Sequence, residues 1–248
     1  MIAKVVFGIL LIAAIALFAR NLGRIGRNIH LGKPQAINDR KAERWSTKAR
    51  VALGQSKMVV RPVAGIMHIL IYAGFIIINL EVLEIIIDGL FGTHRIGAFL
   101  GGFYDFLIGS FEILAIGVLL ACIVFIARRA IIQLPRFHKP EMKGWPSKDA
   151  MIILVTEIVL MCAFLTMNAA DFVLQGLGAE HYTQAGSFPV SAAIASTLNL
   201  SNLQPSTLIT MERTAWWLHI VGILAFLNYL VVSKHLHILL AFPNVWYS

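Results

Sequence analysis

Charged residues are scarce in this sequence of 248 residues: Asp, Glu, Lys and Arg make up 14% of it, whereas 58% is hydrophobic. Soluble domains usually carry about a quarter charged residues, and a soluble fold of this length could not bury so much apolar surface. The composition therefore excludes an ordinary soluble protein. It predicts an integral membrane protein of the all-α class.

Cysteine is also scarce, because Cys122 and Cys162 are the only two and both lie inside apolar stretches. This pattern does not resemble the disulfide framework of a small secreted protein. The C-x-x-C spacing is absent, and an ordinary cubane iron–sulfur cluster needs four thiolates. We therefore expect no iron–sulfur cluster in this chain alone.

Five apolar segments reach or approach the roughly 20 residues that a membrane-spanning helix needs. They cover residues 1–19, 62–90, 99–127, 150–174 and 213–242. We expect a bundle of five transmembrane helices, arranged as three parts. These are an N-terminal transmembrane anchor (1–19), a basic cytoplasmic segment with an interfacial helix (20–61) and a four-helix transmembrane domain (62–248).

The first apolar segment has a second interpretation as a cleaved signal peptide, since residues 14–16 (Ala-Ile-Ala) resemble a processing site. Arg20, Arg24 and Arg27 follow it directly, and positive charge after an apolar stretch resists translocation. The sequence therefore favours a retained anchor.

Basic residues are distributed unevenly among the connections. Residues 20–61 contain 11 Lys and Arg and residues 128–148 contain 6, whereas the other two connections contain only Arg95 before Arg213 begins the last span. By the positive-inside rule the basic segments are cytoplasmic, which places the N-terminus outside and the C-terminus inside. The net charge of +8 thus indicates a multi-pass protein of the inner (cytoplasmic) membrane, not a nucleic-acid-binding protein.

Four of the eight histidines lie in the apolar spans: His68, His219, His235 and His237. Ionisable groups are costly there and point to function by default, although each could also be a satisfied packing residue. His219 and His237 are 18 residues apart, which is five helical turns, so they are expected on one face about 27 Å apart. His235 lies roughly 200° around that helix, and we expect it to be a boundary residue or a donor to a ligand.

His68 and His237 lie at matching depths near the cytoplasmic ends of their spans. Two imidazoles from facing helices are the common axial ligands of a b haem, so these residues are the predicted iron ligands. The four-helix transmembrane domain (62–248) is therefore expected to be haem-binding. Arg61 and Lys234 lie at the level of the haem propionates, or else anchor the helix ends. In the outer half His219 has no facing histidine. Candidates to pair with it are Asn79, Glu81, Glu84 and His94, which would fold back from its loop.

Carboxylates also occur within the spans or at their margins, namely Glu81, Glu84, Asp105, Glu112, Glu157 and Asp171. Quinol oxidation releases two protons and needs a nearby base. Glu81 and Glu84 lie three residues apart at the level of His219, so we predict that His219 with one of them forms a quinone site. The alternative is that they form helix–helix hydrogen bonds.

The last span, WWLHIVGILAFLNYLVVSKHLHILLAFP, resembles the fifth helix of the respiratory nitrate reductase gamma subunit, which carries two histidines at this spacing. The segments GQSKMVVRPVAGIMHI, INLEVLEIIIDGLFGTHR and LTMNAADFVLQ are similar to the membrane half of bacterial oxidoreductases. In that group a gamma-like cytochrome is fused to a heterodisulfide-reductase-like iron–sulfur domain. The likeness covers most of the chain in topology, but the gamma-subunit motifs cover only the second and last spans.

The resemblance implies an inner haem on His68 and His237, and an outer haem on His219 and a histidine ten residues after His68. That position is Ile78 here, so one haem b is expected and a second is left open. The resemblance also implies the membrane component of a quinone-linked oxidoreductase. It would move electrons between a (mena)quinol pool and a cytoplasmic iron–sulfur subunit or fused domain, in a direction that the sequence does not give.

Two other classes remain as alternatives, a haem-free transporter and a membrane scaffold for a cytoplasmic complex. Transporters usually show internal repeats and broken midplane helices, and the sequence shows no repeat. A scaffold would explain the basic segments but not the spacing of the histidines. A reduced-minus-oxidised b-type absorption band separates the cytochrome from both alternatives.

Overall fold

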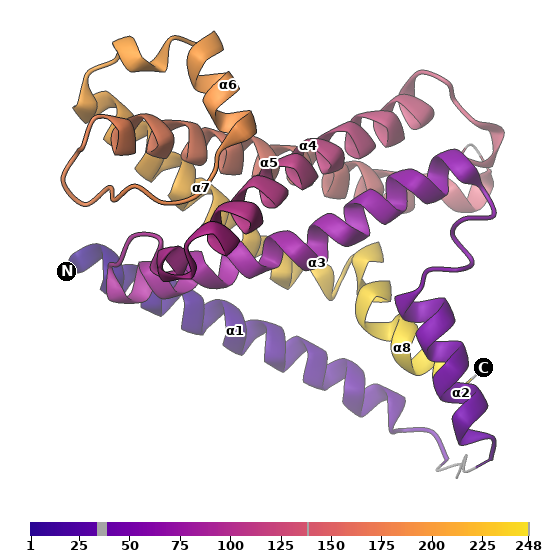
Figure 1. Ribbon diagram of the computed structural model, residues 1–248. Coiled ribbons are helices and arrows are strands. Elements are labelled where there is room, and N and C mark those ends of the chain that lie inside the picture. Colours follow the sequence, from indigo (N-terminus) through magenta and orange to yellow (C-terminus); the bar gives the residue numbers. More distant parts are fainter. Residues whose placement is uncertain (34–38, 138, 248) are drawn as a thin grey trace.

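The computed structural model describes residues 1–33, 39–137 and 139–247, and within these ranges it is almost entirely helical (Figure 1). The long helices are α1 (Ile2–Ile29), α3 (Pro62–Phe91), α4 (Gly102–Ala130), α5 (Trp145–Gly176) and α7 (Pro205–Leu230). The shorter ones are α2 (Lys41–Lys48), α6 (Pro189–Thr197) and α8 (His237–Tyr247). The prediction of an all-α protein is confirmed.

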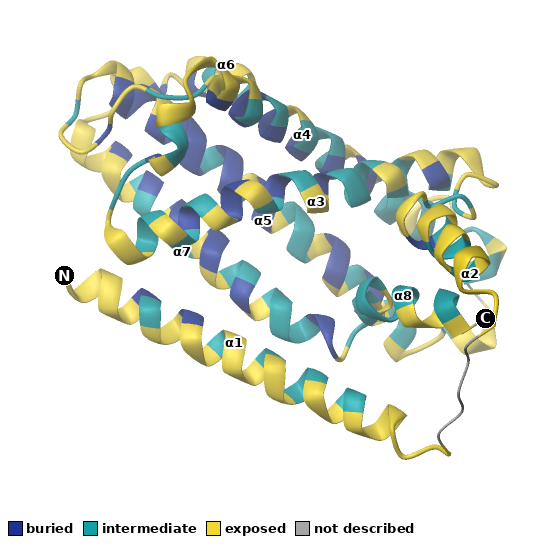
Figure 2. Ribbon diagram, turned by 60° about the horizontal axis from the view of Figure 1, so that its bottom comes forward, coloured by how far each residue is buried: buried dark blue, intermediate teal, exposed yellow. Residues whose placement is uncertain are grey.

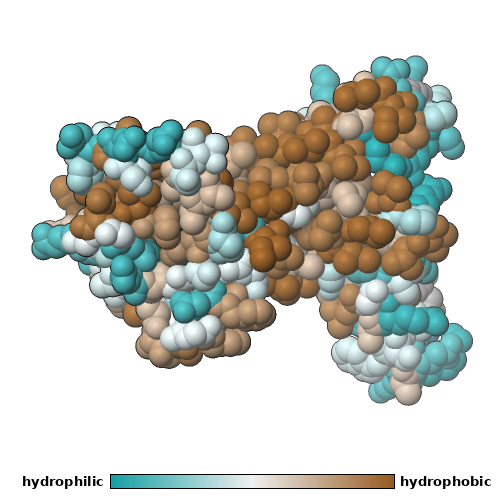
Figure 3. All heavy atoms as spheres, turned by 45° about the horizontal axis from the view of Figure 1, so that its top comes forward, coloured by the Kyte–Doolittle hydropathy of each residue, from teal (hydrophilic) through white to brown (hydrophobic). Residues whose placement is uncertain are grey.

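The helices form a membrane-type bundle. In the part of the chain described, α1, α3, α4 and α5 are each long and apolar enough to cross a bilayer, and the bent pair of α7 and Lys234–Tyr247 makes a fifth span if it is counted as one. Helix α5 packs against both α4 and α7, α3 packs on α4, and α1 contacts α3 and α7. Hydrophobic residues cover the middle of the face in Figure 3, and hydrophilic residues gather towards its two ends, as expected of a protein surrounded by lipid.

Two ends of the bundle matter for function. Lys4, the C-terminus of α3 and α6 lie at one end, which we call the Lys4 end (Figure 1). His68, α2 and α8 lie towards the opposite end, which we call the His68 end. Proline in the first turn starts α3, α5, α6 and α7, where its fixed φ suits a helix and its missing N–H is not needed.

Helix α3 ends at a glycine that also receives α1. Gly92 has a φ of +71°, and a Cβ at this position would overlap the Lys4 side chain. The Lys4 ammonium donates a hydrogen bond to the Phe91 carbonyl at 2.5 Å, which places a cation at the negative end of the α3 dipole. Glycine is therefore required both for the left-handed backbone and for the close approach of α1.

Helix α1 is longer than the predicted anchor of residues 1–19. It continues to Ile29, so Arg20, Arg24 and Arg27 lie on its last turns and do not form a separate interfacial helix. Arginine favours helix and can extend its charge towards water, which lets the helix continue past the apolar run. The short helix of the basic segment is α2 instead. Most of α1 is exposed (Figure 2), and Phe7 and Leu11 are its buried residues.

The last span is not one helix over residues 213–242, and this prediction was wrong. Helix α7 ends at Leu230, a 3₁₀ turn follows at Lys234–Leu236, and the chain bends by 78° before α8. Side chains support the break, because Ser233 Oγ accepts a hydrogen bond from the His235 N–H. Asp149 of α5 accepts one from the Lys234 N–H at 2.9 Å. The five-turn geometry of His219 and His237 is therefore lost.

Candidate functional site

A cavity of about 690 Å³ lies at the His68 end, and we call it the His68 cavity. Helices α3, α4 and α5 form its walls together with the segments before α3, after α4 and after α7. Its lining residues are Lys57, Met58, Val60, Arg61, Ala64, His68, Phe125, Arg129, Arg136, Phe137, Ala150, Ile153, Leu154, Lys234 and His235. Aromatic and aliphatic walls thus combine with a basic rim, and none of these described lining residues is a carboxylate.

Two histidines face this cavity, and they are not the predicted pair. His68 and His235 both line it, whereas His237 is exposed and its Nδ1–H donates to the Lys234 carbonyl at 2.7 Å. The break after Leu230 turns His235 inward, which an unbroken helix would not do. His237 remains close: its ring centroid lies 6.1 Å from that of His235, and it interacts electrostatically with His68.

Several polar atoms around the His68 cavity lack partners in the described structure. Nδ1 of His68 and Nε of Arg128 and Arg136 are buried without a hydrogen bond. Burial lowers the pKa of Arg136, and the neighbouring Arg61 and Arg128 lower it further. Buried donors without acceptors are costly, so the site is suited to an acceptor-bearing anion with an apolar body.

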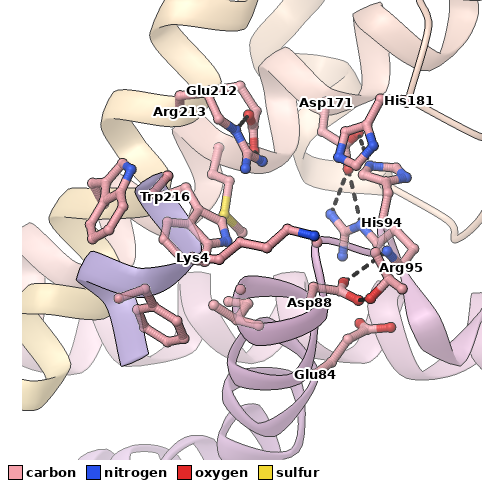
Figure 4. Close-up of a pocket in the computed structure, with 18 of the residues that line it drawn as sticks. Lys4, Glu84, Asp88, His94, Arg95, Asp171, His181, Glu212, Arg213 and Trp216 are labelled. Carbon is pink, nitrogen blue, oxygen red and sulfur yellow. Dashed lines mark hydrogen bonds and ion pairs between the residues drawn. The ribbon is translucent and has the colours of Figure 1, made fainter. Parts of the chain in front are cut away.

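A second cavity, of about 270 Å³, lies at the Lys4 end (Figure 4), and we call it the Arg95 cavity. One side is apolar, with Phe7, Ile85, Met167, Trp216 and Trp217. The polar residues of its lining come from four helices and two connections: Lys4, Glu84, Asp88, Thr93, His94, Arg95, Asp171, His181, Glu212 and Arg213. A flat ring with polar substituents would match this division.

Arg95 is the centre of a buried ion-pair network behind that cavity. It is 7% exposed, and its guanidinium donates to Asp171 at 2.8 and 3.0 Å, to Glu81 at 2.8 Å and to Asn168 at 2.7 Å. Burial alone would lower the pKa of Arg95, but the carboxylates of Asp171 and Glu81 outweigh it and hold that pKa well above its ordinary value. His94 Nε2 joins the network at 2.9 Å from Asp171.

The structure does not bring His219, Glu81 and Glu84 together. Glu81 pairs with Arg95 behind the cavity wall, and Glu84 accepts hydrogen bonds from the Gly97 N–H and the Tyr104 hydroxyl, both at 2.8 Å. Only Glu84 of the three lines the Arg95 cavity. For Glu81 and Glu84, the alternative of hydrogen bonds between structural elements is what the structure shows.

His219 lies instead beside a separate cavity of about 70 Å³, which Ile78 and Glu157 also line. Its Nδ1–H donates to the Leu160 carbonyl at 2.9 Å, and its Nε2 has no partner in the described chain. Close packing surrounds it, since a Cβ on Gly74 would lie 2.5 Å from Val118. These residues do not fit an outer haem, because the space is small and the facing position is an isoleucine.

Most of the remaining intramembrane carboxylates hold the connection between α5 and α7. Glu112 accepts hydrogen bonds from the backbone N–H groups of Val190 and Ser191, at 2.8 and 3.1 Å, and thereby caps α6. Asp105 accepts one from the Gly186 N–H at 3.0 Å. Among the described residues Glu157 shows no such partner. The connection at the Lys4 end is thus fixed to the bundle and covers the Arg95 cavity.

Lys4, His181, Arg213 and Trp216 are lining residues that the sequence did not single out. His181 has a left-handed φ of +79°, which is uncommon for a residue other than glycine. Burial lowers the pKa of His181, and the nearby His94 lowers it further, which favours the neutral ring. In the sequence, the one signal that pointed to this cavity was Arg95, because it is the single basic residue in its connection. His94 does fold back, but onto Asp171 and not towards His219.

No family model matches this chain, and no solved structure matches it. A probable iron–sulfur-binding oxidoreductase of Bacillus subtilis (strain 168), FadF, is 26% identical over 220 residues, which are 89% of this chain and 29% of FadF. The chain is a distant homologue of that oxidoreductase. It spans less than a third of that relative's length, and the resemblance to the nitrate reductase gamma subunit gains no support from this match.

Proposed function

We propose that this chain is the membrane part of a quinone-linked oxidoreductase that carries electrons between a (mena)quinone and an iron–sulfur partner. Three observations support the proposal. The homologue is described as an iron–sulfur-binding oxidoreductase, the chain forms a multi-helix membrane bundle, and it has two different cavities, one at each end. The part of FadF that this chain does not cover would correspond to the partner, either fused or separate.

The single observation that carries the proposal is the composition of the His68 cavity. Two imidazoles, apolar walls, a basic rim and the unpartnered Nε of Arg136 fit a b haem. His68 and His235 would hold the iron, with His237 the alternative to His235, and Arg61, Arg136 and Lys234 would bind the propionates. Bis-imidazole haem iron takes up and releases one electron at a time. The protein contributes the ligands, the apolar shell and the positive charges.

Orientation follows from the basic residues. The segments 20–61 and 128–148 lie towards the His68 end, so the positive-inside rule puts that end in the cytoplasm. A haem there would lie near a cytoplasmic iron–sulfur partner, whose acidic surface would complement the basic rim. The Lys4 end would then face the outside, where protons of a quinol can be released.

The quinone is assigned to the Arg95 cavity. Its ring would lie against Trp216 and Trp217, and its oxygens would meet Glu84 and His181. This site replaces the grouping of His219 with Glu81 and Glu84, of which Glu84 alone remains at the cavity. Glu81 has a supporting role, since it neutralises Arg95.

Absorption of the purified protein tests the proposal. We expect a reduced-minus-oxidised b-type band and about one haem per chain by pyridine haemochrome assay. His68→Leu should abolish the band while the protein still inserts in the membrane, and His30→Leu, at the exposed end of α1, is the matched control. A colourless protein after expression with added haem precursor would exclude the haem and with it the proposed electron path.

A further inference from the structure

The mouth of the Arg95 cavity contains a histidine that no part of the buried network needs. We propose that His181 exchanges the ring-hydroxyl proton of the quinone with the aqueous phase at the Lys4 end. This inference rests on the function proposed above, and it assigns the proton acceptor within that site.

His181 lies between the Arg95 cavity and water. His181 lines the cavity and is exposed, so it can contact both a bound ring and water. Figure 4 shows its imidazole beside Asp171, on the same side of the cavity as His94. Its ring centroid lies 5.6 Å from that of His94 and 5.7 Å from that of Tyr182. The group therefore stands at the boundary that a released proton has to cross.

The ring nitrogens of His181 are available to a ligand, whereas those of His94 are not. His94 has both ring nitrogens engaged, Nε2 with Asp171 at 2.9 Å and Nδ1 with the Thr183 hydroxyl at 3.4 Å. His181 makes ring contacts but no hydrogen bond within the described structure, so its nitrogens are available to a ligand. A strained left-handed backbone at this residue is typical of positions maintained for function.

Charged groups of both signs surround His181. The groups that act on it are His94 from the connection after α3, Asp88 from α3, and Glu212 and Arg213 from α7. Glu212 accepts a hydrogen bond from Tyr182 and pairs with Arg213. A proton on His181 is therefore not trapped by an unpaired carboxylate, which suits a group that gains and loses a proton in each cycle.

In quinol oxidation His181 would accept the protons of the two ring hydroxyls one after the other. A hydroxyl O–H bond of the quinol breaks, an N–H bond forms on His181, and that proton then passes to water. The second hydroxyl loses its proton in the same way after His181 has been deprotonated. The two electrons would leave singly, and a haem held by His68 and His235 would supply the one-electron acceptor. For quinone reduction every step runs in reverse.

His181→Gln tests this role, because glutamine can hydrogen-bond a quinone but cannot accept its proton. General acid–base groups typically contribute about 10²–10⁴-fold. We therefore expect quinol-driven haem reduction to slow by about tenfold or more. Quinone-analogue binding, followed by quenching of Trp216 and Trp217 fluorescence, should change by less than about twofold. The decline in rate on the acidic side of the pH profile, where His181 becomes protonated, should disappear.

His30→Gln is the matched control and should keep the rate and the pH profile of the unaltered protein. Reduction by dithionite must be unchanged in both variants, which shows that the haem site is intact. A wild-type rate and pH profile in His181→Gln would overturn the assignment of His181 alone. If the unaltered, haem-loaded protein is not reduced by quinol at all, the proposed function fails and the inference fails with it.

Discussion

The carboxylate of Asp149 on α5 accepts a hydrogen bond from the Tyr229 hydroxyl at 2.5 Å, one residue before α7 ends. Its other oxygen accepts the backbone N–H of Lys234 on the far side of the break. Asp149 is 1% exposed, so it joins both ends of the interruption from within the bundle. The residue that follows Lys234 is His235, and the orientation of its ring therefore depends on this bracket.

Asp149→Asn should weaken the bracket, because the amide of asparagine presents donor hydrogens where the carboxylate accepted two. Hydrogen bonds to charged groups contribute about 1.5–3 kcal/mol, and we expect a loss of that size with reduced haem content. Tyr229→Phe removes one of the two bonds and should cost roughly half as much. The measurements are the thermal midpoint in detergent and the haem-to-protein ratio. Unchanged values in Asp149→Asn would show that the break is stabilised by other contacts.

The choice between His235 and His237 gives the next prediction. His235 lines the His68 cavity and His237 is exposed, so His235→Leu should lose most of the b-type absorbance and His237→Leu should keep it. Both variants change the same residue type within three positions, which makes each the control for the other. The reverse result would identify His237 as the ligand and require α7 to continue through the break when haem is bound.

His219 should contribute nothing to haem content. Its cavity measures about 70 Å³ and faces Ile78, whereas its Nδ1 holds Leu160 of α5. We expect His219→Leu to leave the haem-to-protein ratio unchanged and to lower the thermal midpoint, since one buried hydrogen bond of about 0.5–1.5 kcal/mol is lost. Loss of half the haem in this variant would reveal a second haem and contradict the close packing around His219.

The number and approximate positions of the spans were predictable from the sequence, because the thickness of the bilayer sets the length of an apolar run. The break after Leu230 was not, since it depends on Asp149, some 80 residues away in sequence. The side of the helix on which His235 lies changes with that break, so the sequence could not show which of His235 and His237 faces the cavity. Of the predicted cofactor-binding residues, His68, Arg61 and Lys234 line the His68 cavity, whereas His237 and His219 do not.

The Arg95 cavity was also only partly predictable. Carboxylates at spaced positions near the end of α3 indicated a polar site, but their partners come from tertiary structure. Asp171 reaches Arg95 across 76 residues, and Lys4 reaches Phe91 across 87. The sequence therefore showed that charges are buried at this depth, and the fold decides that Glu81 is a structural partner while Glu84 lines the cavity.

Replacement of Arg95 should be among the most damaging single changes. Arg95→Met leaves the buried carboxylates of Asp171 and Glu81 without their cation, and loss of one partner of a buried pair costs about 3–5 kcal/mol. In the unaltered protein the pKa of Arg95 is raised. Its stabilisation is therefore complete below its unfolded-state pKa and is lost only as the pH rises through the still higher folded value.

A pH series separates this ion pair from weaker ones. Arg95 stays charged throughout the range from pH 7 to pH 10. We therefore expect any decline of the thermal midpoint over this range to be the same in the unaltered protein and in Arg95→Met. A midpoint that falls steeply with pH in the unaltered protein, but not in Arg95→Met, would contradict the assignment of a raised pKa to this guanidinium.

The junction of α1 with α3 gives the last prediction, in which two glycines serve as a matched pair. Gly92 and Gly101 both have positive φ, at +71° and +56°, but only Gly92 is in contact with Lys4, and nothing lies within 4 Å of a Cβ on Gly101. An alanine in the left-handed helical conformation of Gly92 costs about 1–2 kcal/mol. Gly101, with a ψ of −132°, lies in a different positive-φ region that also disfavours a side chain, so both Gly92→Ala and Gly101→Ala should lower the thermal midpoint.

Quinone binding distinguishes the two variants. In Gly92→Ala the new methyl group displaces the Lys4 ammonium, which reaches the Arg95 cavity, and we expect weaker quinone-analogue binding by tryptophan fluorescence. Gly101→Ala should bind as the unaltered protein does. Equal affinities in both variants would mean that α1 only supports the bundle. Weaker binding in Gly92→Ala alone would show that the N-terminal helix forms part of the site and has to be retained in the working protein.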